Sequence, residues 1–278
     1  METAMSDDAF QPPSLATLER LLAPSRAWFD PVCFGLKAFD LKRPALFVGN
    51  HGLFSIDAPL MLAALYREHG VLVRALGDHL HFRLPVWGPM VRRFGGVEGT
   101  PANCSELMQR GESILVFPGG AREVMRRKTD GYDLVWKQRT GFARLAIQHG
   151  YDIIPFAAVG ANETYRILLD ADEMRASRPW RWLDRHLDLD RRSRQGDMLS
   201  PLVRGVGPTL LPRPQRFYYA FGERITTAPL RSEHPDSDTL WGVRRQTERA
   251  IGDLTRLLLD YREADRASWP AWRRWLAP

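Results

Sequence analysis

The chain has 278 residues, of which 44% are hydrophobic and 26% are charged, the ordinary balance of a folded globular protein. Its two cysteines, Cys33 and Cys104, are too few for a disulfide framework and lack the spacing of metal ligands, so we expect a reducing compartment and no metal site. The formal net charge of +6 favours anionic partners, which include nucleic acids, acidic lipid headgroups and phosphate-rich cosubstrates.

Strands and helices are predicted to alternate up to residue 159. The segment 1–13 is polar, ends in two prolines and is expected to be disordered. Beyond it, helical periodicity predicts helices and short apolar runs predict strands. The expected helices are 14–29, 58–68, 101–110 and 140–149, and the expected strands are 45–48, 71–76, 113–117 and 152–159. This alternation predicts an α/β fold with a mostly parallel central sheet flanked by helices.

The pattern loosens between residues 167 and 215, a stretch rich in Arg, Asp, Trp and Pro. We interpret it as an insertion or lid rather than as a second domain. A strand at 216–222 and a long amphipathic helix at 241–262 follow. The predicted organisation is a tail with an amphipathic helix at 1–40, a main domain at 41–265 and a Trp/Arg-rich tail at 266–278.

Tryptophans and arginines are neighbours in two segments, 180–182 and 269–275. Indole rings beside cations are typical of a membrane interface, although tryptophans of the core beside solvated arginines would give the same pattern. No run reaches the roughly 18 apolar residues of a spanning helix, and no signal peptide is predicted. We therefore expect a cytoplasmic protein that lies peripherally on the inner face of a membrane and contacts its anionic surface through these amphipathic segments.

A histidine lies at the end of the first predicted buried strand. His51 closely follows the strand 45–48, and Asp57 follows His51 after five intervening residues. Ligands bind at the carboxyl ends of strands in open α/β sheets. Residues six apart lie about 240° apart on an ideal helix, so His51 and Asp57 can meet only across a turn, which Gly52 permits. An aspartate bonded to one imidazole nitrogen leaves the other nitrogen free to take a proton.

The same segment has a second interpretation. Asp57 would serve as the N-cap of the helix 58–68, with Pro59 tolerated in its first turn. His51 would then be an ordinary histidine of the core. This segment alone leaves both interpretations open.

A glycine-rich turn follows the predicted strand 113–117. It consists of Phe117, Pro118, Gly119 and Gly120 and continues through Ala121 into Arg122 and Glu123. Glycines let the backbone approach a ligand closely, and an arginine offers a bidentate clamp for a carboxylate or phosphate. A plain strand-to-helix turn would have the same composition, so this segment alone does not decide between the two.

The two segments together resemble motifs of the glycerolipid acyltransferase superfamily, in which a His-x-x-x-x-Asp motif precedes a Phe-Pro-Glu-Gly-Thr-Arg turn. They are closer to the diacylglycerol-acyltransferase-like branch, whose first motif has one extra residue and whose second motif begins Pro-Gly-Gly. The segments 134–146 and 153–156 resemble later motifs of that branch in the same order. The resemblance covers roughly residues 44–225. It implies a glycerol-3-phosphate-acyltransferase-like fold in which 41–265 is the acyltransferase domain.

The resemblance implies a role for each matched residue. His51 is expected to be the general base, Asp57 the residue that orients it, and Arg122 a contact of the acceptor. Gly119 occupies the position at which phosphate-binding members of the family carry a glutamate. In this chain the glutamate is in effect moved to Glu123. The absence of an acid at position 119 favours a neutral acceptor. The expected substrate-binding residues are Phe117, Pro118, Gly119, Gly120, Arg122 and Glu123.

Two further groups of basic residues are predicted to lie at the surface. The run Arg126-Arg127-Lys128 is predicted to be a solvated face, with CoA phosphates or lipid headgroups as the alternative ligands. His79 and His81 are predicted to be surface or lid residues.

Acyl transfer from a thioester to an alcohol needs a base and a stabilised oxyanion but no covalent nucleophile. We therefore predict an O-acyltransferase without a bound cofactor. Its donor is acyl-CoA or an acyl-carrier protein, and its acceptor is a neutral glycerolipid or long-chain alcohol. The alternatives are a lysophosphatidate or lysophospholipid acyltransferase and a catalytically inactive lipid-binding protein. Nucleic-acid binding is disfavoured because the basic residues are interleaved with acids.

Overall fold

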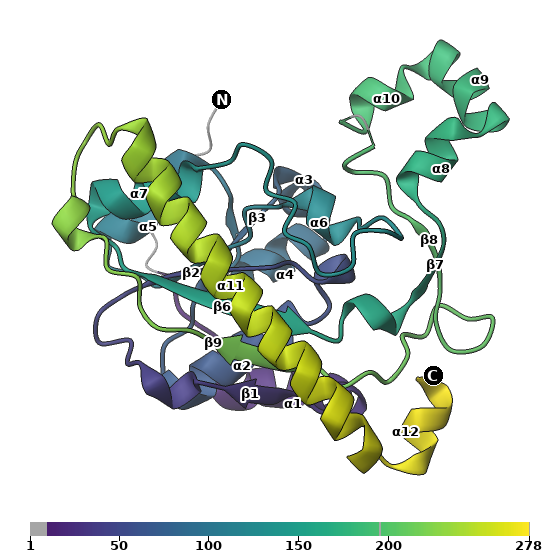
Figure 1. The fold of residues 1–278 in the computed structure, drawn as a ribbon, viewed down its shortest axis with the longest axis horizontal. Helices are drawn as coiled ribbons and strands as arrows, with labels where there is room; N and C mark the ends of the chain where they lie inside the picture. The colour runs from purple at the N-terminus through teal and green to yellow at the C-terminus, as the bar shows by residue number, and fades with distance from the viewer. Residues whose placement is uncertain (1–9, 195, 278) are drawn as a thin grey trace.

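A seven-stranded sheet forms the centre of the molecule in the computed structural model, which describes residues 10–194 and 196–277 (Figure 1). The predicted disorder of the N-terminal segment falls largely outside this range. The strand order is β1-β9-β6-β2-β5-β3-β4, and every neighbouring pair is parallel except β6 with β9. The strands are β1 Val32–Phe34, β2 Leu46–Gly49, β3 Arg74–Gly77, β4 Val97–Glu98, β5 Ile114–Val116, β6 Ile153–Val159 and β9 Tyr218–Phe221. The prediction of a mostly parallel α/β sheet is confirmed.

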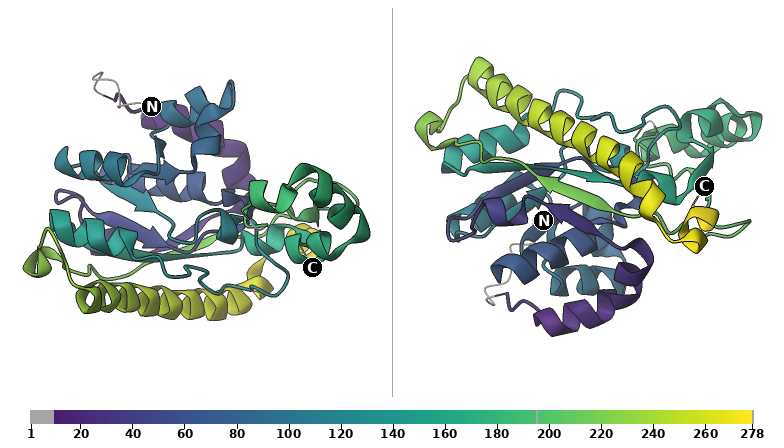
Figure 2. Two further views of the ribbon diagram at one scale, coloured as in Figure 1. Left: turned by 90° about the horizontal axis from the view of Figure 1, so that it is seen from above. Right: turned by 60° about the horizontal axis from the view of Figure 1, so that its bottom comes forward.

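Helices cover both faces of this sheet (Figure 2). On one face, α1 (Leu15–Phe29) and α2 (Ala58–His69) pack over a core that includes Phe47 and Phe156. On the other face lie α5 (Pro101–Gln109), α7 (Gly141–His149) and the long α11 (Ser237–Asp265). All seven residues of β6 are buried because helices cover the sheet on both sides. This burial explains the continuous apolar run of β6.

The shortest elements were not predicted. They include β1, β4, the helices α3 (His79–Arg83), α4 (Trp87–Arg93) and α6 (Ala121–Val124), and the 3-10 turns Leu36–Ala38, Leu53–Ser55, Asn162–Thr164, Ala228–Leu230 and Arg266–Ser268. Elements of two to seven residues complete at most two helical turns, so they leave little periodicity to read. The strand expected at 71–76 begins only at Arg74.

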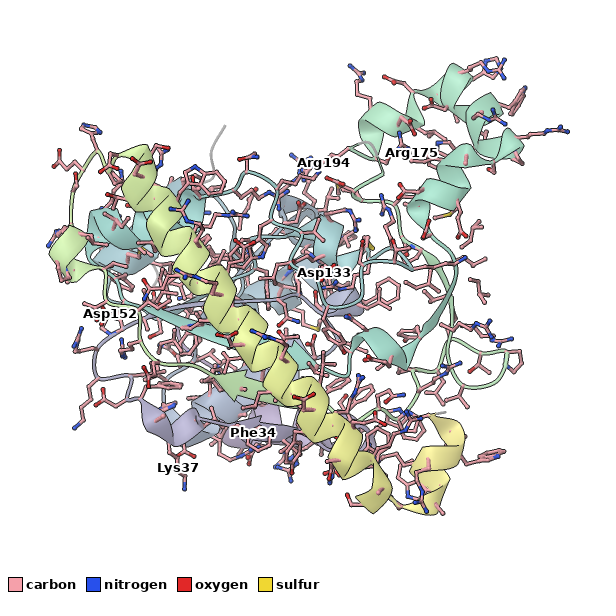
Figure 3. The ribbon with its side chains drawn as sticks, viewed as in Figure 1. Phe34, Lys37, Asp133, Asp152, Arg175 and Arg194 are labelled. Carbon is pink, nitrogen blue, oxygen red and sulfur yellow. The ribbon has the colours of Figure 1, made fainter. Side chains whose placement is uncertain are left out.

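The chain between residues 166 and 204 leaves the body of the molecule. β7 (Arg166–Leu169) and β8 (Leu202–Arg204) form a two-stranded antiparallel ribbon that carries α8 (Ala171–Ala176), α9 (Arg178–Leu187) and α10 (Leu189–Arg192). These helices project at one end of the molecule (Figure 1). Arg175, labelled in Figure 3, makes two hydrogen bonds with the Asp190 carboxylate at 2.9 and 2.6 Å, which joins α8 to α10. This projection corresponds to the segment predicted as an insertion or lid.

The C-terminal segment is more buried than the predicted membrane-contact tail. The Trp269 indole donates a hydrogen bond to Asp265 Oδ2 at 3.1 Å, and Arg273 donates to the backbone oxygen of Pro214 at 3.0 Å. Both side chains are buried, whereas Trp272 and Trp275 of α12 (Ala271–Leu276) are exposed. The membrane interpretation was therefore wrong for Trp269 and Arg273. Within the described residues, every helix is too short or too polar to cross a bilayer.

Candidate active site

Two neighbouring parallel strands bring the two predicted motifs together. β2 leads into His51 and β5 leads into Phe117, and the strands pair in register at Val48 and Val116. The imidazole of His51 stacks on the Phe117 ring with centroids 3.7 Å apart and an interplanar angle of 9°. Parallel strands end at the same edge of a sheet, so residues 66 positions apart in sequence become neighbours in space.

Asn50 fixes the backbone immediately before His51. Its side-chain amide donates to the backbone oxygen of Ala158 and accepts from the Ala158 N–H, both at 2.8 Å. The side chain is fully buried. It therefore continues the hydrogen bonding between β2 and β6 beyond the end of β2, and it holds the peptide that carries the histidine. The one sequence signal for this role is a polar residue that directly follows an apolar strand.

His51 does not bond to Asp57 in the described structure. Its Nε2 lies 3.1 Å from Ser55 Oγ, and its Nδ1 lies 3.5 Å from the same oxygen. The chain returns to His51 because Phe54 and Ser55 both adopt left-handed backbone conformations with φ of 57°. Such conformations cost about 1–2 kcal/mol each for residues other than glycine and are concentrated at functional sites. The orienting bond expected from Asp57 is absent here, and Ser55 takes its place.

Gly52 is required for close packing rather than for a turn. Its φ of −72° is accessible to any residue, so the prediction that its conformational freedom forms the turn was wrong. A Cβ added to Gly52 would lie 2.8 Å from both carboxylate oxygens of Asp57 and 2.7 Å from the Cβ of Ala161. The absence of a side chain lets the Asp57 carboxyl lie against the backbone next to His51.

The Asp57 carboxyl is buried and only partly satisfied. Its side chain makes no capping hydrogen bond to α2, although the residue occupies the N-cap position, and Oδ1 has no hydrogen-bond partner within the described chain. Burial raises the pKa of Asp57 to about 6. The backbone N–H groups of Asp57 and Ala58 lower this pKa, but burial outweighs them. The geometry therefore argues against the simple capping interpretation.

Glu123 supports the site from behind. It is fully buried, and its carboxylate accepts the backbone N–H of His51 at 3.2 Å and that of Val135 at 2.8 Å. Burial raises the pKa of this carboxyl above its ordinary value. Both oxygens accept backbone N–H groups, and the expectation that Glu123 contacts substrate stays a prediction. Glu123 is a positioning residue that ties the two motifs together.

Arg122 is paired with a residue that the sequence did not indicate. Its guanidinium makes a bidentate ion pair with Asp130, at 2.6 and 3.0 Å, and both side chains are largely buried. The hydrogen bond with Asp130 raises the pKa of Arg122 further. Neutralisation by the adjacent Glu123, the partner suggested by sequence proximity, does not occur because Glu123 points toward the backbone of His51. Asp130 is thus a site residue that the motifs alone did not reveal.

The basic run at 126–128 is largely buried, so its assignment to a solvated face was wrong for Arg126 and Arg127. Arg126 donates to the backbone oxygen of His51 at 3.2 Å and to that of Gly131 at 3.0 Å. Of the three basic residues, only Lys128 is exposed, and its ammonium group pairs with the Glu173 carboxylate of α8. The loop that follows α6 folds back over the carboxyl ends of the strands, which is why these guanidinium groups are enclosed.

This environment keeps the imidazole of His51 uncharged. Burial, with a smaller contribution from the cation Arg126, lowers the pKa of His51 to about 3. A neutral imidazole has a lone pair that can accept a proton. The site therefore presents a proton acceptor beside a buried carboxyl that lacks one partner, an arrangement typical of acid–base chemistry.

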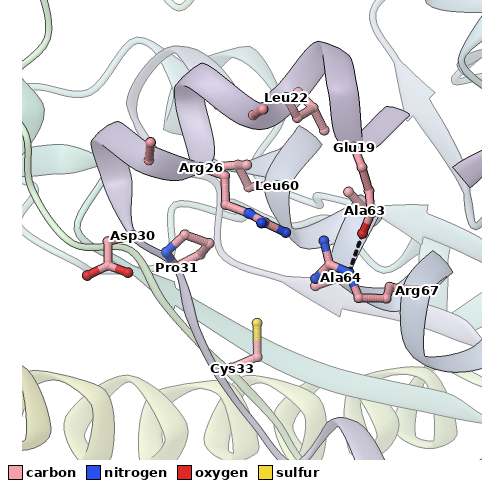
Figure 4. Close-up of a pocket in the computed structure, with 12 residues that line it drawn as sticks. Glu19, Leu22, Arg26, Asp30, Pro31, Cys33, Leu60, Ala63, Ala64 and Arg67 are labelled. Atoms are coloured by element: carbon pink, nitrogen blue, oxygen red, sulfur yellow. Dashed lines mark hydrogen bonds and ion pairs between the residues drawn. The ribbon is translucent and has the colours of Figure 1, made fainter. Parts of the chain in front are cut away.

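The described residues also form a cavity away from this site. This cavity of about 460 Å³ between α1 and α2 is lined by Leu22, Cys33 and Leu60, and Arg67 pairs with Glu19 at 2.6 Å at its edge (Figure 4). It contains none of the predicted site residues. Within the described chain, no group of three or more His, Cys, Asp or Glu side chains is placed to hold a metal ion.

Residues 31–159 match a family model described as Acyltransferase. This part of the chain is an acyltransferase-family domain. It contains both motifs and the loop with Asp130, so the resemblance inferred from the motif residues is confirmed at the level of the family.

Two curated relatives match a larger part of this chain. It is 29% identical over 269 residues to phytyl ester synthase 2, chloroplastic, of Arabidopsis thaliana, which covers 93% of this chain and 37% of that protein. It is 30% identical over 156 residues to the DGAT1/2-independent enzyme synthesizing storage lipids of Bos taurus, which covers 56% of this chain and 45% of that protein. The chain thus spans less than half the length of either relative.

A solved structure confirms the expected fold. The crystal structure of the 1-acyl-sn-glycerophosphate (LPA) acyltransferase PlsC from Thermotoga maritima superimposes with a TM-score of 0.52. The match covers 86% of this chain and 79% of that chain at 15% identity. The shared feature is the mostly parallel sheet with flanking helices.

Proposed function

We propose that the chain transfers a fatty acyl group from a thioester to the hydroxyl of a neutral glycerolipid or a long-chain alcohol. The observation that carries the choice of acceptor is the bidentate pair between Arg122 and Asp130. A largely buried cation that already has a carboxylate partner offers no free charge to a phosphate. The relatives above are named for a phytyl ester and for storage lipids, and these names support a neutral product.

The reaction follows from the state of His51. Its neutral imidazole takes the proton of the acceptor hydroxyl while the hydroxyl oxygen attacks the carbonyl carbon of the thioester. The tetrahedral intermediate expels the thiolate, which takes the proton back from the imidazolium. The products are an ester and a free thiol, and no acyl-enzyme is formed.

Asp57 completes this proposal. When His51 becomes an imidazolium it needs a nearby anion, and the unpartnered Oδ1 of Asp57 is available for that role. We therefore assign to the substrate-bound state a rotation of His51 away from Ser55 and toward Asp57. Catalytic hydrogen bonds are often absent or long in free enzymes and tighten when substrate binds.

The proposed donor is acyl-CoA or an acyl-carrier protein, which acts as a cosubstrate, and no bound cofactor takes part. The proposed partners are this donor, the lipid acceptor and an anionic membrane surface on which a cytoplasmic protein lies peripherally. Nucleic acid is not among the proposed partners.

A competition assay tests the acceptor. The purified chain is supplied with oleoyl-CoA and with diacylglycerol and lysophosphatidate at equal concentration in mixed micelles, with His51→Ala as the inactive control. We expect triacylglycerol to be the main product. Preferential conversion of lysophosphatidate, lost in Arg122→Ala, would identify a lysophosphatidate acyltransferase instead. Lipid binding without any ester product, from either donor and with any acceptor, would identify an inactive lipid-binding protein.

A further inference from the structure

Two short helices beside the site expose an unusual set of apolar side chains. α3 and α4, together with their connection, form a helical hairpin at residues 79–93, which we call the α3–α4 hairpin. Val86 at its tip is 84% exposed, and Phe82 alone among its large apolar residues is buried. The exposed apolar side chains are Leu80, Leu84, Val86, Trp87 and Met90.

The hairpin is built to hold these side chains outward. A Cβ on Gly88 would lie 2.6 Å from the backbone oxygen of Phe82, so the two helices are in close contact. Val86 adopts a φ of 69°, which is a strained conformation for a β-branched residue. Pro85 and Pro89 restrict the backbone on either side. The exposure therefore belongs to a defined structure rather than to a frayed loop.

The hairpin surface is cationic as well as apolar. Residues 79–97 contain no acidic residue, and Arg83, Arg92 and Arg93 are exposed. The nearest acid in sequence, Asp78, is neutralised by Arg194 at 3.2 Å (Figure 3 labels Arg194) and approached by His79 at 3.0 Å. Apolar side chains flanked by arginines that form no ion pair within the described chain complement a bilayer surface with anionic headgroups.

The hairpin is also continuous with the candidate site. Trp87 donates its indole N–H to Nδ1 of His81 at 3.1 Å. His81 is in turn close enough to His51 to contribute to the lowering of the His51 pKa. The hairpin follows the carboxyl end of β3, and the neighbouring parallel strands β5 and β2 end at the same edge. A lipid surface in contact with Trp87 would therefore lie at the edge of the sheet that carries His51.

We propose that the α3–α4 hairpin docks on an anionic lipid bilayer, with its apolar side chains among the acyl chains and its arginines at the phosphates. Docking itself does not depend on the proposed function. Only its consequence, the delivery of a lipid acceptor to His51, rests on that function. The main membrane contact is thereby assigned to this hairpin instead of the segments 180–182 and 269–275. The segment 180–182 lies in α9, which carries the acid Asp184 and is followed by Asp188, and these acids would repel anionic headgroups. The segment 269–275 buries Trp269 and Arg273, so it offers fewer side chains to a bilayer.

Vesicle co-sedimentation tests the proposal. The unaltered protein is mixed at low salt with vesicles of phosphatidylcholine and phosphatidylglycerol in equal amounts, or of phosphatidylcholine alone. The Leu84→Asp/Val86→Asp variant should bind the mixed vesicles at least about tenfold more weakly, because it removes two apolar side chains from the bilayer and adds negative charge beside the anionic headgroups. Aspartate lacks the branched Cβ of valine, so the positive φ at this position is less strained in the variant, which should keep its fold. Arg83→Gln/Arg93→Gln should weaken binding to the mixed vesicles but not to phosphatidylcholine.

Two controls make the test specific. Leu210→Asp replaces another highly exposed leucine, outside the hairpin, and should leave binding unchanged. Trp275→Asp changes the most exposed tryptophan of the C-terminal segment and should weaken binding less than the hairpin variant does. Equal binding by the hairpin variant and the unaltered protein would overturn the proposal, as would a dominant effect of Trp275→Asp. Failure of the unaltered protein to bind either vesicle would do the same.

Activity separates this inference from the proposed function. With a water-soluble short-chain alcohol and a short-chain acyl thioester, Leu84→Asp/Val86→Asp should retain the turnover of the unaltered protein. With acceptor embedded in mixed vesicles its turnover should fall in proportion to the lost binding. Vesicle binding through the hairpin without acyl transfer to any acceptor would contradict the proposed function and leave the docking surface standing.

Discussion

The carboxyl group of Glu123 occupies the space in which a side chain at Gly119 would begin. A Cβ on Gly119 would lie 2.0 Å from Cδ of Glu123, well inside any tolerated contact. The same carboxylate accepts the N–H of His51. The hydrogen bond between Glu123 and the His51 N–H therefore requires glycine at position 119. This requirement explains the first glycine of the Pro-Gly-Gly sequence.

Gly119→Ala should displace Glu123 and loosen both motifs. We expect the free energy of unfolding to fall by about 1–3 kcal/mol, the usual cost of overpacking, and turnover to fall at least about tenfold. Thermal unfolding and initial-rate assays measure the two effects. In Gly252→Ala, within α11, the new methyl meets nothing within 4 Å and should stabilise the helix by roughly 0.5–1 kcal/mol. Native activity in Gly119→Ala would show that the Glu123 contact is dispensable.

Removing Glu123 as well separates strain from positioning. In Gly119→Ala/Glu123→Ala the steric clash is gone, so part of the stability should return. Turnover should stay low because the His51 N–H then has no carboxylate acceptor. Recovery of turnover together with stability would mean that Glu123 acts only through the fold.

His51→Ala should abolish acyl transfer and leave the fold intact. A positioned base contributes about 10²–10⁴-fold, so residual turnover should be at least about a hundredfold lower. Circular dichroism and thermal unfolding verify the fold, and product analysis with oleoyl-CoA measures the rate. His234→Ala, which alters an exposed loop histidine, is the matched control. A folded His51→Ala protein with near-native turnover would remove His51 from the mechanism.

Asp57→Asn should lower turnover while raising stability. The pKa of Asp57, about 6, lies above its ordinary value of 3.8, so ionising this carboxyl as the pH rises costs folding free energy. The neutral amide avoids this cost, which corresponds to at most about 3 kcal/mol above pH 6. Denaturant unfolding at pH 5 and pH 8, two conditions chosen on either side of this pKa, should show the gain mainly at pH 8.

The same carboxyl predicts the pH dependence of catalysis. His51 stays neutral down to a pH of about 3, so the acid limb of kcat/KM should come from protonation of Asp57, with a midpoint near 6. Asp57→Asn should lose that limb. Unchanged turnover and an unchanged profile in Asp57→Asn would favour a role in capping α2, because asparagine and aspartate are equivalent caps.

Ser55→Ala should have a small effect. In the proposed reaction Ser55 only holds His51 before substrate binds, so turnover should remain within about tenfold of the unaltered protein. A serine nucleophile paired with histidine would instead leave an acylated serine. Intact-mass measurement after rapid mixing with oleoyl-CoA distinguishes the two. An added oleoyl group on the protein, absent in Ser55→Ala, would replace direct transfer with a two-step mechanism.

Asp130→Asn should change the choice of acceptor. The amide keeps a hydrogen-bond acceptor for Arg122 but removes the charge that neutralises the guanidinium. The ratio of kcat/KM for lysophosphatidate to that for diacylglycerol should rise about tenfold, the effect of one charge-assisted hydrogen bond. Asp133→Asn changes an exposed aspartate of the same loop and should leave the ratio unchanged. An unaltered ratio in Asp130→Asn would remove the argument for a neutral acceptor.

The sequence alone determined the central elements and the place of the site. Apolar runs that end in Gly49-Asn50 and Phe117-Pro118 correctly indicated β2 and β5, because buried parallel strands are apolar on both faces. Parallel pairing then requires the residues that follow these strands to meet at one edge. The sequence therefore indicated correctly that His51 lies at the carboxyl end of a buried strand.

Only the tertiary structure decided which side chains meet which partners. Arg122 pairs with Asp130 instead of Glu123, and His51 contacts Ser55 instead of Asp57, because these contacts depend on how the loop after α6 and the turn after β2 fold back. The same holds for burial. Local periodicity separates an apolar face from a polar one, but it does not tell whether another element covers the apolar face. The sequence therefore predicted that Arg126 is solvated, and it did not indicate that Val86 and Trp87 are exposed. The burial of Arg126 and the exposure of Val86 and Trp87 depend on how the rest of the chain packs around them.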